Sequence, residues 1–374
     1  MKVALCIRKD YLEKHGGDSV QLLHTKAWME RLFQTETLVV TDPSQLDGSF
    51  DIIHIFNLAT REATAAYFDK AKSLGKKTAL STIFWDYTYQ ATKDFASAIN
   101  YRIYDFPGLV PLFVQLDKLT ALIFSKPRII SSSFRHFVMD CLNQADHLLP
   151  NSIEELQHAA DFARLEAKKL IHKTTVVLNA TEPGKYSFME DFHEVYQLPR
   201  NYILQVGRIE YIKNQLVVIE ALKKDPEMPV VFLGRPNGEK YFKIVKDKAE
   251  KRGNVFFRDE VPHSDIHLFY KNARLHVLPS LRESPGLVNL EALQNGCPIV
   301  VSNKNFLPFD TYFRGIATAV DPLSPASVRD GIMKELCMKR DMPSIKQLVK
   351  ERFSWEQAAR QTYQAYQAML KEPA

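Results

Sequence analysis

The chain has 374 residues, of which 45% are hydrophobic and 25% are charged, and its formal net charge at pH 7 is +5. This length exceeds the usual size of one hydrophobic core, so two domains are expected in an otherwise ordinary soluble protein. The mild positive charge suits an anionic small molecule or a negatively charged membrane face, and it excludes the dense basic clusters of a nucleic-acid-binding protein.

Cysteine spacing and hydropathy indicate a cytosolic protein. The four cysteines are widely scattered and form no C-x-x-C pair, so neither a zinc site nor a disulfide framework is indicated. The opening stretch "MKVALCIRKDY" has charges directly after a short apolar run, which favours a first β-strand over a signal peptide. No apolar window reaches the length of about 18 residues that a transmembrane helix needs.

In the first half of the chain, strands of buried type alternate with helix-like segments. Continuous Val, Ile and Leu runs separated by helices predict a parallel sheet that is covered on both faces. The expected strands are 2–7, 36–41, 51–57, 76–84, 147–152 and 174–179. One helix is expected after a turn at Gly16 and Gly17, a second at 60–74, and a third after residue 152.

Residues 85–137 interrupt this alternation with an irregular, aromatic-rich stretch. Aromatic and basic side chains mix there, among them Tyr104, Phe106, Lys126 and Arg128. Two interpretations are open: a helical insertion with an ordinary core, or a surface that faces an acceptor or a membrane.

The alternation restarts after 180–200, a stretch without clear periodicity that we interpret as an interdomain linker. The last helix is expected to begin after Ser354 as its N-cap, with Glu356 adding negative charge to the first turn. The remaining expected strands are 202–207, 229–234, 254–259, 275–280 and 298–303, and the remaining helices are 213–224, about 239–251, "DIHLFYKNA" and "LVNLEALQNG".

This pattern predicts two doubly wound α/β domains of similar size. Ligands of such sheets bind outside the carboxyl ends of the strands. With two domains, the natural site is a cleft between those two edges.

The stretch "VGRIEYIKNQ" (206–215) follows the first strand of the second domain. Gly207 permits a tight turn close to a ligand, and Arg208 and Lys213 would bind a diphosphate and neutralise a leaving group. The alternative is that both cations are surface charges around an ordinary loop.

The stretch "RESPGLVNLEAL" (282–293) suggests an anion site at a helix start. Ser284 fits the N-cap and Pro285 the first helical position. The backbone N–H groups of Gly286 and Leu287 would then face a phosphate, and Gly286 would let it come close.

Two glutamates, Glu283 and Glu291, bracket this anion site and would accept hydrogen bonds from neutral hydroxyls. These groups would suit a ligand that has hydroxyls at both ends and phosphate in the middle, which is the layout of a nucleotide-sugar. The alternative is an amphipathic helix with solvated glutamates, but Glu291 lies among apolar neighbours, where an unpaired carboxylate is costly.

These motifs resemble the retaining glycosyltransferases of the GT-B fold, in the family-four type often labelled glycosyl transferases group one. The E-x7-E motif stands as Glu283 through Glu291, and "VGRIEYIKN" is similar to the family's diphosphate-binding loop. "NVFFRDEVPHSDIHLFYKNA" resembles its base-binding segment, where the backbone around Val261 would contact the nucleobase, and "FSWEQAARQTYQAY" resembles its closing helix.

The first domain resembles the family more loosely. "HGGD" (15–18) is similar to the glycine turn whose residues, here Gly16 and Gly17, approach the donor phosphate and the acceptor. Many members carry a His-Asp pair where this chain reads "TIFWDYTY", with Asp86 but no adjacent histidine, so Asp86 is the candidate from that loop.

The resemblance implies a GT-B fold of two Rossmann-like, doubly wound parallel-sheet domains that face each other across a cleft. Residues 1–185 would form the acceptor domain, with a C-terminal helix at about 354–374 packing back onto it. Residues 195–353 would form the donor domain.

The implied reaction moves a sugar from a UDP- or GDP-sugar to an acceptor hydroxyl with retained anomeric configuration. Glu283, Arg208, Lys213 and Asp86 would carry catalysis, and Gly16, Gly17, Val261, Ser284, Gly286, Leu287 and Glu291 would bind substrate with the two cations.

No D-x-D pair is present, so neither a metal nor another cofactor is expected. The acceptor would be a glycan or a lipid-linked intermediate of bacterial surface polysaccharide, lipopolysaccharide or glycolipid synthesis. The enzyme would be cytoplasmic, with peripheral contact to the inner face of the membrane. An epimerase-like relative and a non-catalytic nucleotide-sugar-binding protein are the alternatives.

Overall fold

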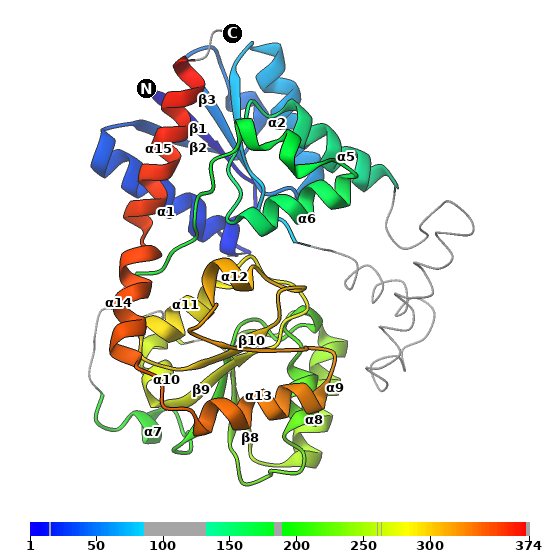
Figure 1. Cartoon of the computed structure of the whole chain (residues 1–374), viewed down its shortest axis with the longest axis vertical. Coiled ribbons are helices and arrows are strands. Elements are labelled where there is room, and N and C mark those ends of the chain that lie inside the picture. The colour runs from blue at the N-terminus through cyan, green and yellow to red at the C-terminus, as the bar shows by residue number, and fades with distance from the viewer. Residues whose placement is uncertain (15, 86–131, 183–188, 260, 263, 372–374) are drawn as a thin grey trace. The chain divides into compact units, whose positions relative to one another are not determined.

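The structure is a computed structural model, and it describes the chain except for residues 15, 86–131, 183–188, 260, 263 and 372–374 (Figure 1). The described residues form two compact units. The first contains residues 1–85, 132–180 and 353–371, and the second contains 181–182 and 189–352.

The first unit is built on a five-stranded sheet in the order β2-β1-β3-β4-β5, in which all paired strands are parallel. The strands alternate with helices along the chain, so each crossover connection carries a helix or a long segment. The strands are β1 Lys2–Cys6, β2 Glu36–Val40, β3 Ile52–Phe56, β4 Lys77–Ser81 and β5 His147–Leu148; the helices are α1 Gly17–Phe33, α2 Arg61–Ser73, α5 Ser132–Gln144, α6 Ile153–Ala163 and α15 Trp355–Lys371.

The core of this unit lies between the sheet and the pair α1 and α15, which run side by side (Figure 1). All five residues of β3 are buried, as expected of a central parallel strand with both faces covered. Trp355 at the start of α15 stacks on His24 of α1, with ring centroids 4.5 Å apart. The C-terminal helix is therefore part of the first unit.

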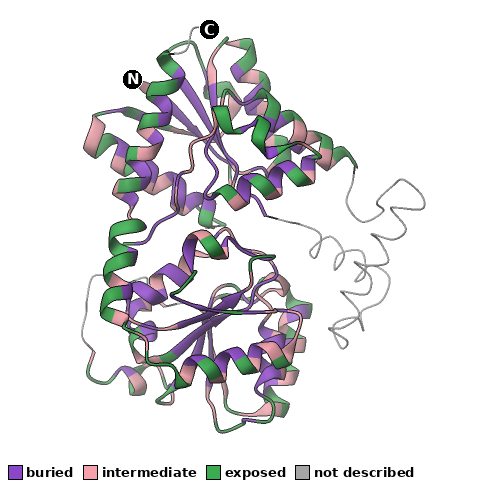
Figure 2. Ribbon diagram, in the orientation of Figure 1, coloured by how far each residue is buried: buried purple, intermediate pink, exposed green. Residues whose placement is uncertain are grey.

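The second unit holds a six-stranded parallel sheet in the order β11-β10-β9-β6-β7-β8. Figure 2 shows the central strands of this sheet mostly buried, whereas all four residues of the edge strand β8 are only half-buried. The strands are β6 Tyr202–Val206, β7 Val230–Leu233, β8 Val255–Arg258, β9 Ala273–Leu278, β10 Ile299–Ser302 and β11 Thr318–Val320; the helices are α7 Phe192–Val195, α8 Gln215–Ala221, α9 Glu239–Arg252, α10 Ile266–Asn272, α11 Leu287–Gln294, α12 Phe309–Tyr312, α13 Pro325–Cys337 and α14 Met342–Arg352.

The fold class predicted from the sequence is confirmed: both units are parallel-sheet α/β structures. The last helix begins as predicted, since the Ser354 side chain accepts a hydrogen bond from the Gln357 N–H at 3.3 Å. Within the described part of the chain, no helix has the length and apolar character that crossing a bilayer requires.

The predicted strand at 174–179 is wrong. This segment runs beside β5 and forms a single bridge between Thr174 and Leu148. The Val177 N–H donates to the Pro150 carbonyl, but Pro150 has no N–H to give in return, so the ladder ends there. The region 85–137, for which two interpretations were open, lies mostly outside the described residues, and its last residues, 132–137, form the start of α5.

Candidate active site

The strand order of the second sheet defines where a ligand site is expected. β6 lies between β7 and β9, so the chain winds outward from β6 to β7 and β8 on one side, and from β9 to β10 and β11 on the other. The carboxyl ends of β6 and β9 thus flank the topological switch point, where open α/β sheets bind ligands. The loops after these two strands carry Lys213 and Glu283.

Lys213 and Glu283 form an ion pair across this switch point. Lys213 closes a short 3-10 helix at Tyr211–Lys213, and its Nζ lies 2.5 Å from Glu283 Oε1. The side chains are 18% and 8% exposed, so both charges are largely withdrawn from water. Two predicted site residues, 70 positions apart in sequence, therefore meet at one point.

Arg208 does not join this pair. Its guanidinium lies 3.3 Å from Glu210 Oε1, and its side chain is 53% exposed. Its backbone carbonyl accepts a hydrogen bond from Gln215 Nε2 at 3.0 Å, which fixes the loop at the start of α8. The structure thus places Arg208 in the predicted loop with its charge in solvent.

The N-cap of α11 predicted at Ser284 is wrong by two residues. The helix begins at Leu287 with Gly286 as its N-cap, and Ser284 and Pro285 lie in the preceding loop. The Glu283 N–H donates to the Phe306 carbonyl at 2.9 Å, which keeps the chain in a loop at that point. Gly286 then turns the chain into the helix with φ +86°, a conformation that favours glycine.

Gly286 is also required by the side chains around it. A Cβ atom at this position would lie 3.0 Å from Asn289 Nδ2 and 3.2 Å from the Glu283 carboxylate. Gly286 and Leu287 still lie at the N-terminus of α11, where backbone N–H groups lack intrahelical acceptors and form the positive end of the helix dipole.

Glu291 lies in the middle of α11 and is half-buried. Its Oε2 accepts a hydrogen bond from the Tyr270 hydroxyl at 3.2 Å. Burial raises the pKa of Tyr270 well above its ordinary value, and the charge of Glu291 adds to this shift. Glu291 is therefore not a fully solvated glutamate, because its carboxylate accepts a hydrogen bond from the buried Tyr270.

Two buried polar residues at this site have no counterpart in the sequence prediction. His276 on β9 and Asn289 on α11 are both 0% exposed. The Val206 N–H donates to His276 Nε2 at 3.2 Å. Burial, and after it the charge of Lys213, lowers the pKa of His276 to about 3 against the opposing effect of a hydrogen bond with the Asn289 side chain, so both residues are neighbours of the histidine.

Sequence alone offered one signal for this pair. Histidine and asparagine are unusual in an otherwise apolar buried strand and on the buried side of a helix. Nothing in the sequence showed that the two side chains meet.

Two other predicted site residues are not brought to this point. Val261 follows β8 at the edge of the sheet, two strands from β6, and is half-buried. Asp86 lies outside the described residues.

The first unit has its own polar cluster at the switch point between β1 and β3. Arg8, just after β1, binds Asp18 through Nε to Oδ2 at 3.0 Å and through Nη2 to Oδ1 at 3.1 Å. Asn57, just after β3, donates to the same carboxylate at 3.2 Å. Burial tends to raise the pKa of Asp18, but the hydrogen bonds and the charge of Arg8 outweigh it and the pKa is lowered.

This cluster shapes the glycine turn that the sequence singled out. A Cβ on Gly16 would lie 2.8 Å from Asp18 Oδ1, so the close approach of Asp18 requires glycine. Gly17 begins α1 and has open space around its Cβ position. The residues that hold the turn are Arg8, Asp18 and Asn57.

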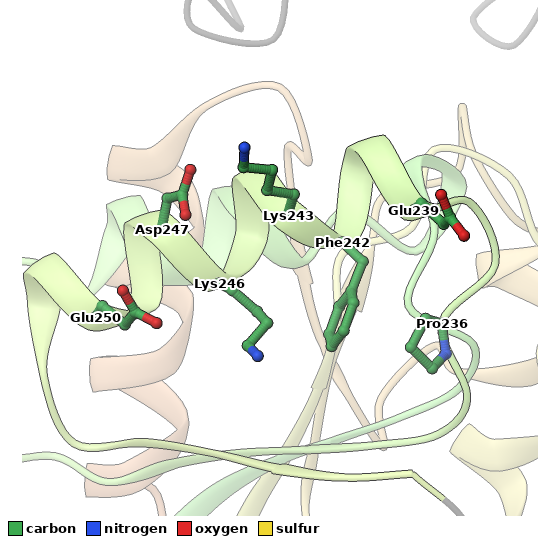
Figure 3. Close-up of a pocket in the computed structure, with 7 residues that line it drawn as sticks. All are labelled: Pro236, Glu239, Phe242, Lys243, Lys246, Asp247 and Glu250. Atoms are coloured by element: carbon green, nitrogen blue, oxygen red, sulfur yellow. The ribbon is translucent and has the colours of Figure 1, made fainter.

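Other features of the described residues do not add to the site. No three His, Cys, Asp or Glu side chains among them stand close enough to hold a metal ion. A hollow along α9 is lined by Pro236, Phe242 and charged side chains of the helix, and none of the predicted site residues lines it (Figure 3).

Comparison with known proteins finds a family match that lies within the second unit. Residues 189–334 match the family described as Glycosyl transferases group 1. O-antigen chain mannosyltransferase B of Escherichia coli is 30% identical over 188 residues, which cover 46% of this chain and 48% of that protein. D-inositol 3-phosphate glycosyltransferase of Mycobacterium tuberculosis (strain H37Ra) is 29% identical over 203 residues, which cover 51% and 37% of the two chains. The alignments thus span about half the length of the curated relatives or less.

Solved structures share the fold along nearly the whole chain. Anabaena HepE in complex with UDP and glucose superposes with a TM-score of 0.70 at 14% identity, covering 98% of this chain and 100% of that one. Sucrose-phosphate synthase of Thermosynechococcus elongatus superposes with a TM-score of 0.72 at 14% identity, covering 99% of both. The chain therefore has the GT-B fold, and residues 189–334, within its second unit, are similar to the glycosyl transferases group 1.

Proposed function

We propose that the protein is a retaining glycosyltransferase that moves a sugar from a UDP- or GDP-sugar to an acceptor hydroxyl. One observation carries the proposal: Lys213, Glu283 and the glycine start of α11 converge at the switch point of the second sheet. A cation, a carboxylate and a helix N-terminus at one point match the diphosphate and the sugar hydroxyls of such a donor.

Each group has a distinct task in this mechanism. Lys213 and Arg208 neutralise the departing diphosphate, together with the N–H groups of Gly286 and Leu287. Glu283 accepts hydrogen bonds from sugar hydroxyls and Glu291 from the ribose. The acceptor attacks on the face from which the diphosphate leaves, and a phosphate oxygen takes its proton, so the reaction needs no strong protein base and no metal.

The identity of the substrates is supported by what similar proteins are named for. Two of the similar Escherichia coli proteins are named as mannosyltransferases, one of them for the O-antigen chain, and HepE has been crystallised with UDP-glucose. We infer an acceptor of the surface polysaccharide, lipopolysaccharide or glycolipid class. The first unit would receive it at Gly16 and Gly17, in the cytoplasm at the inner face of the membrane.

The test is a transfer assay with purified protein and a panel of UDP- and GDP-sugars, in which donor binding is measured by calorimetry. We expect one donor to bind, and NMR of the product to show the anomeric configuration of the donor retained. Lys213→Ala is expected to lower the transfer rate by about 100-fold, the typical cost of removing one donor to a developing charge. Lys223→Ala, a surface lysine paired with Glu220, is the matched control.

Binding and transfer together separate this proposal from its alternatives. A protein that binds nucleotide-sugars without turnover is a binding protein, and one that converts the donor sugar itself is epimerase-like. If no nucleotide-sugar or nucleoside diphosphate binds at millimolar concentration, the proposal fails. If Arg208→Ala and Glu291→Ala leave donor binding unchanged, the tasks assigned to these residues are wrong.

A further inference from the structure

Asn289 is a buried amide whose NH2 group has no hydrogen-bond partner among the described residues. It is 0% exposed, and its side chain interacts with His276. Buried polar groups are nearly always paired, because leaving one unpaired costs free energy, so an exception requires an explanation. Asn289 Nδ2 and the Glu283 carboxylate both lie close to the Cβ position of Gly286, and this neighbourhood provides one.

His276 fixes the direction in which this amide points. Its Nε2 accepts a hydrogen bond from the Val206 N–H, so the proton of the neutral ring is on Nδ1. Nδ1 is itself buried, and the Asn289 side chain is its neighbour. An Nδ1–H donor beside an amide favours the amide oxygen on that side and leaves the NH2 group on the other.

The NH2 group faces the loop that carries Glu283. The Cβ position of Gly286 lies 3.0 Å from Asn289 Nδ2 and 3.2 Å from Glu283 Oε2. Glycine at this place leaves no side chain between the amide and the carboxylate. Glu283 thus has Lys213 at Oε1 and the donor of Asn289 across Gly286 from Oε2.

A bound diphosphate would affect the two neighbours of Glu283, Lys213 and Asn289, in different ways. A diphosphate that binds Lys213 competes with Glu283 for the same ammonium group. Glu283 is only 8% exposed, and a buried carboxylate that loses its cation needs hydrogen-bond donors to remain charged and oriented. The neutral amide of Asn289 is unaffected by the diphosphate and remains available.

We propose that Asn289 is a positioning residue, oriented by His276, that donates to Glu283 when the donor diphosphate draws Lys213 away. This inference rests on the proposed function, because it assumes a diphosphate at Lys213. It predicts that Asn289 acts on the transfer step through Glu283 and contributes little to binding of the diphosphate itself.

The experiment compares Asn289→Leu with Asn289→Ser, which keeps a hydrogen-bond donor. Asn289→Leu is expected to lower kcat by about tenfold or more, the range for losing a hydrogen bond to a charged group, and to leave the Kd of the nucleoside diphosphate within about twofold. Asn289→Ser should restore part of the rate. Gln294→Leu is the matched control, since Gln294 is another buried amide of α11 with an unpaired oxygen, and its kcat should be that of the wild type.

A double-mutant cycle with Glu283→Gln decides between positioning and mere packing. If Asn289 acts through Glu283, then Asn289→Leu costs nothing further in the Glu283→Gln background. Three results would each overturn the inference. They are an equal loss of rate in both backgrounds, an unchanged kcat of Asn289→Leu, and a diphosphate affinity that falls by as much as the rate. A wild-type protein without donor binding or transfer would instead refute the proposed function.

Discussion

At the scale of single residues, Gly286 links the backbone of α11 to the chemistry of Glu283. Its φ of +86° is costly for any L side chain, and a Cβ would press against Asn289 Nδ2 and the Glu283 carboxylate. Gly315 has nearly the same φ, +83°, but open space around its Cβ position. Alanine at Gly315 is therefore expected to lose only the backbone term, about 1–2 kcal/mol.

Gly286→Ala is expected to lose more free energy of unfolding than Gly315→Ala and to weaken binding of nucleoside diphosphates. Urea unfolding measures the first difference and calorimetric titration the second. Equal destabilisation by the two substitutions, with diphosphate binding intact in both, would show that the contacts around Gly286 carry no function.

The residues of the site divide into those that sequence could reveal and those that it could not. Lys213 and Glu283 were predictable because each lies in a loop that follows a strand of the second sheet, within a stretch that resembles a family motif. Asn289 and His276 were not, because their roles arise from a contact between a helix and a strand. Arg8, Asp18 and Asn57 meet in the same way, from two strand ends and a helix start.

At the scale of elements, α15 is held in the first unit by a buried hydrogen-bond chain. His54 on β3 binds the Tyr366 hydroxyl through Nδ1 at 2.6 Å and Ser81 Oγ through Nε2 at 2.9 Å. Tyr366→Phe would leave the buried Nδ1 unpaired, so we expect a loss of about 1–3 kcal/mol in the free energy of unfolding.

The matched control for this prediction is Tyr363→Phe on the same helix. The Tyr363 ring stacks on Phe33 with centroids 3.9 Å apart, a contact that phenylalanine retains. Its free energy of unfolding should stay within about 0.5 kcal/mol of the wild type. Urea unfolding followed by circular dichroism checks both variants, and a Tyr366→Phe protein as stable as the control would contradict the role given to this chain of hydrogen bonds.

Periodicity predicted the central strands and most helices, and it failed where a single backbone group decides the structure. The segment 174–179 reads as a strand, but the missing N–H of Pro150 ends its pairing. The helix α11 begins later than predicted because the Glu283 N–H donates to the Phe306 carbonyl and because Gly286 adopts the turn that begins the helix. Such tertiary hydrogen bonds leave no local pattern in the sequence.

At the scale of the whole molecule, each unit contains a fully buried histidine with a lowered pKa, His54 in the first and His276 in the second. Burial lowers the pKa of His54 in the first unit to about 3, from an ordinary value of 6.5. For His276 in the second unit, burial and then Lys213 lower the pKa to about 3, against the opposing effect of Asn289. Both histidines become protonated in the unfolded chain well before they do so in the folded one.

The free energy of unfolding should therefore fall as the pH falls from 6.5 towards 3. In this window the unfolded state binds more protons, and each histidine contributes a slope of about 1.4 kcal/mol per pH unit. The carboxylates with a lowered pKa have an ordinary value of 3.8, as for Asp18 and Asp225, or of 4.5, as for Glu30 and Glu166, and they add most of their loss in more acid solution. Urea unfolding at pH 6.5, 6.0 and 5.5, about where the histidines dominate, measures the effect. His54→Gln and His276→Gln should each remove about half of the slope, because the two groups lie in separate units. A free energy of unfolding that stays constant between these pH values would mean that one or both rings accept a proton in the folded protein.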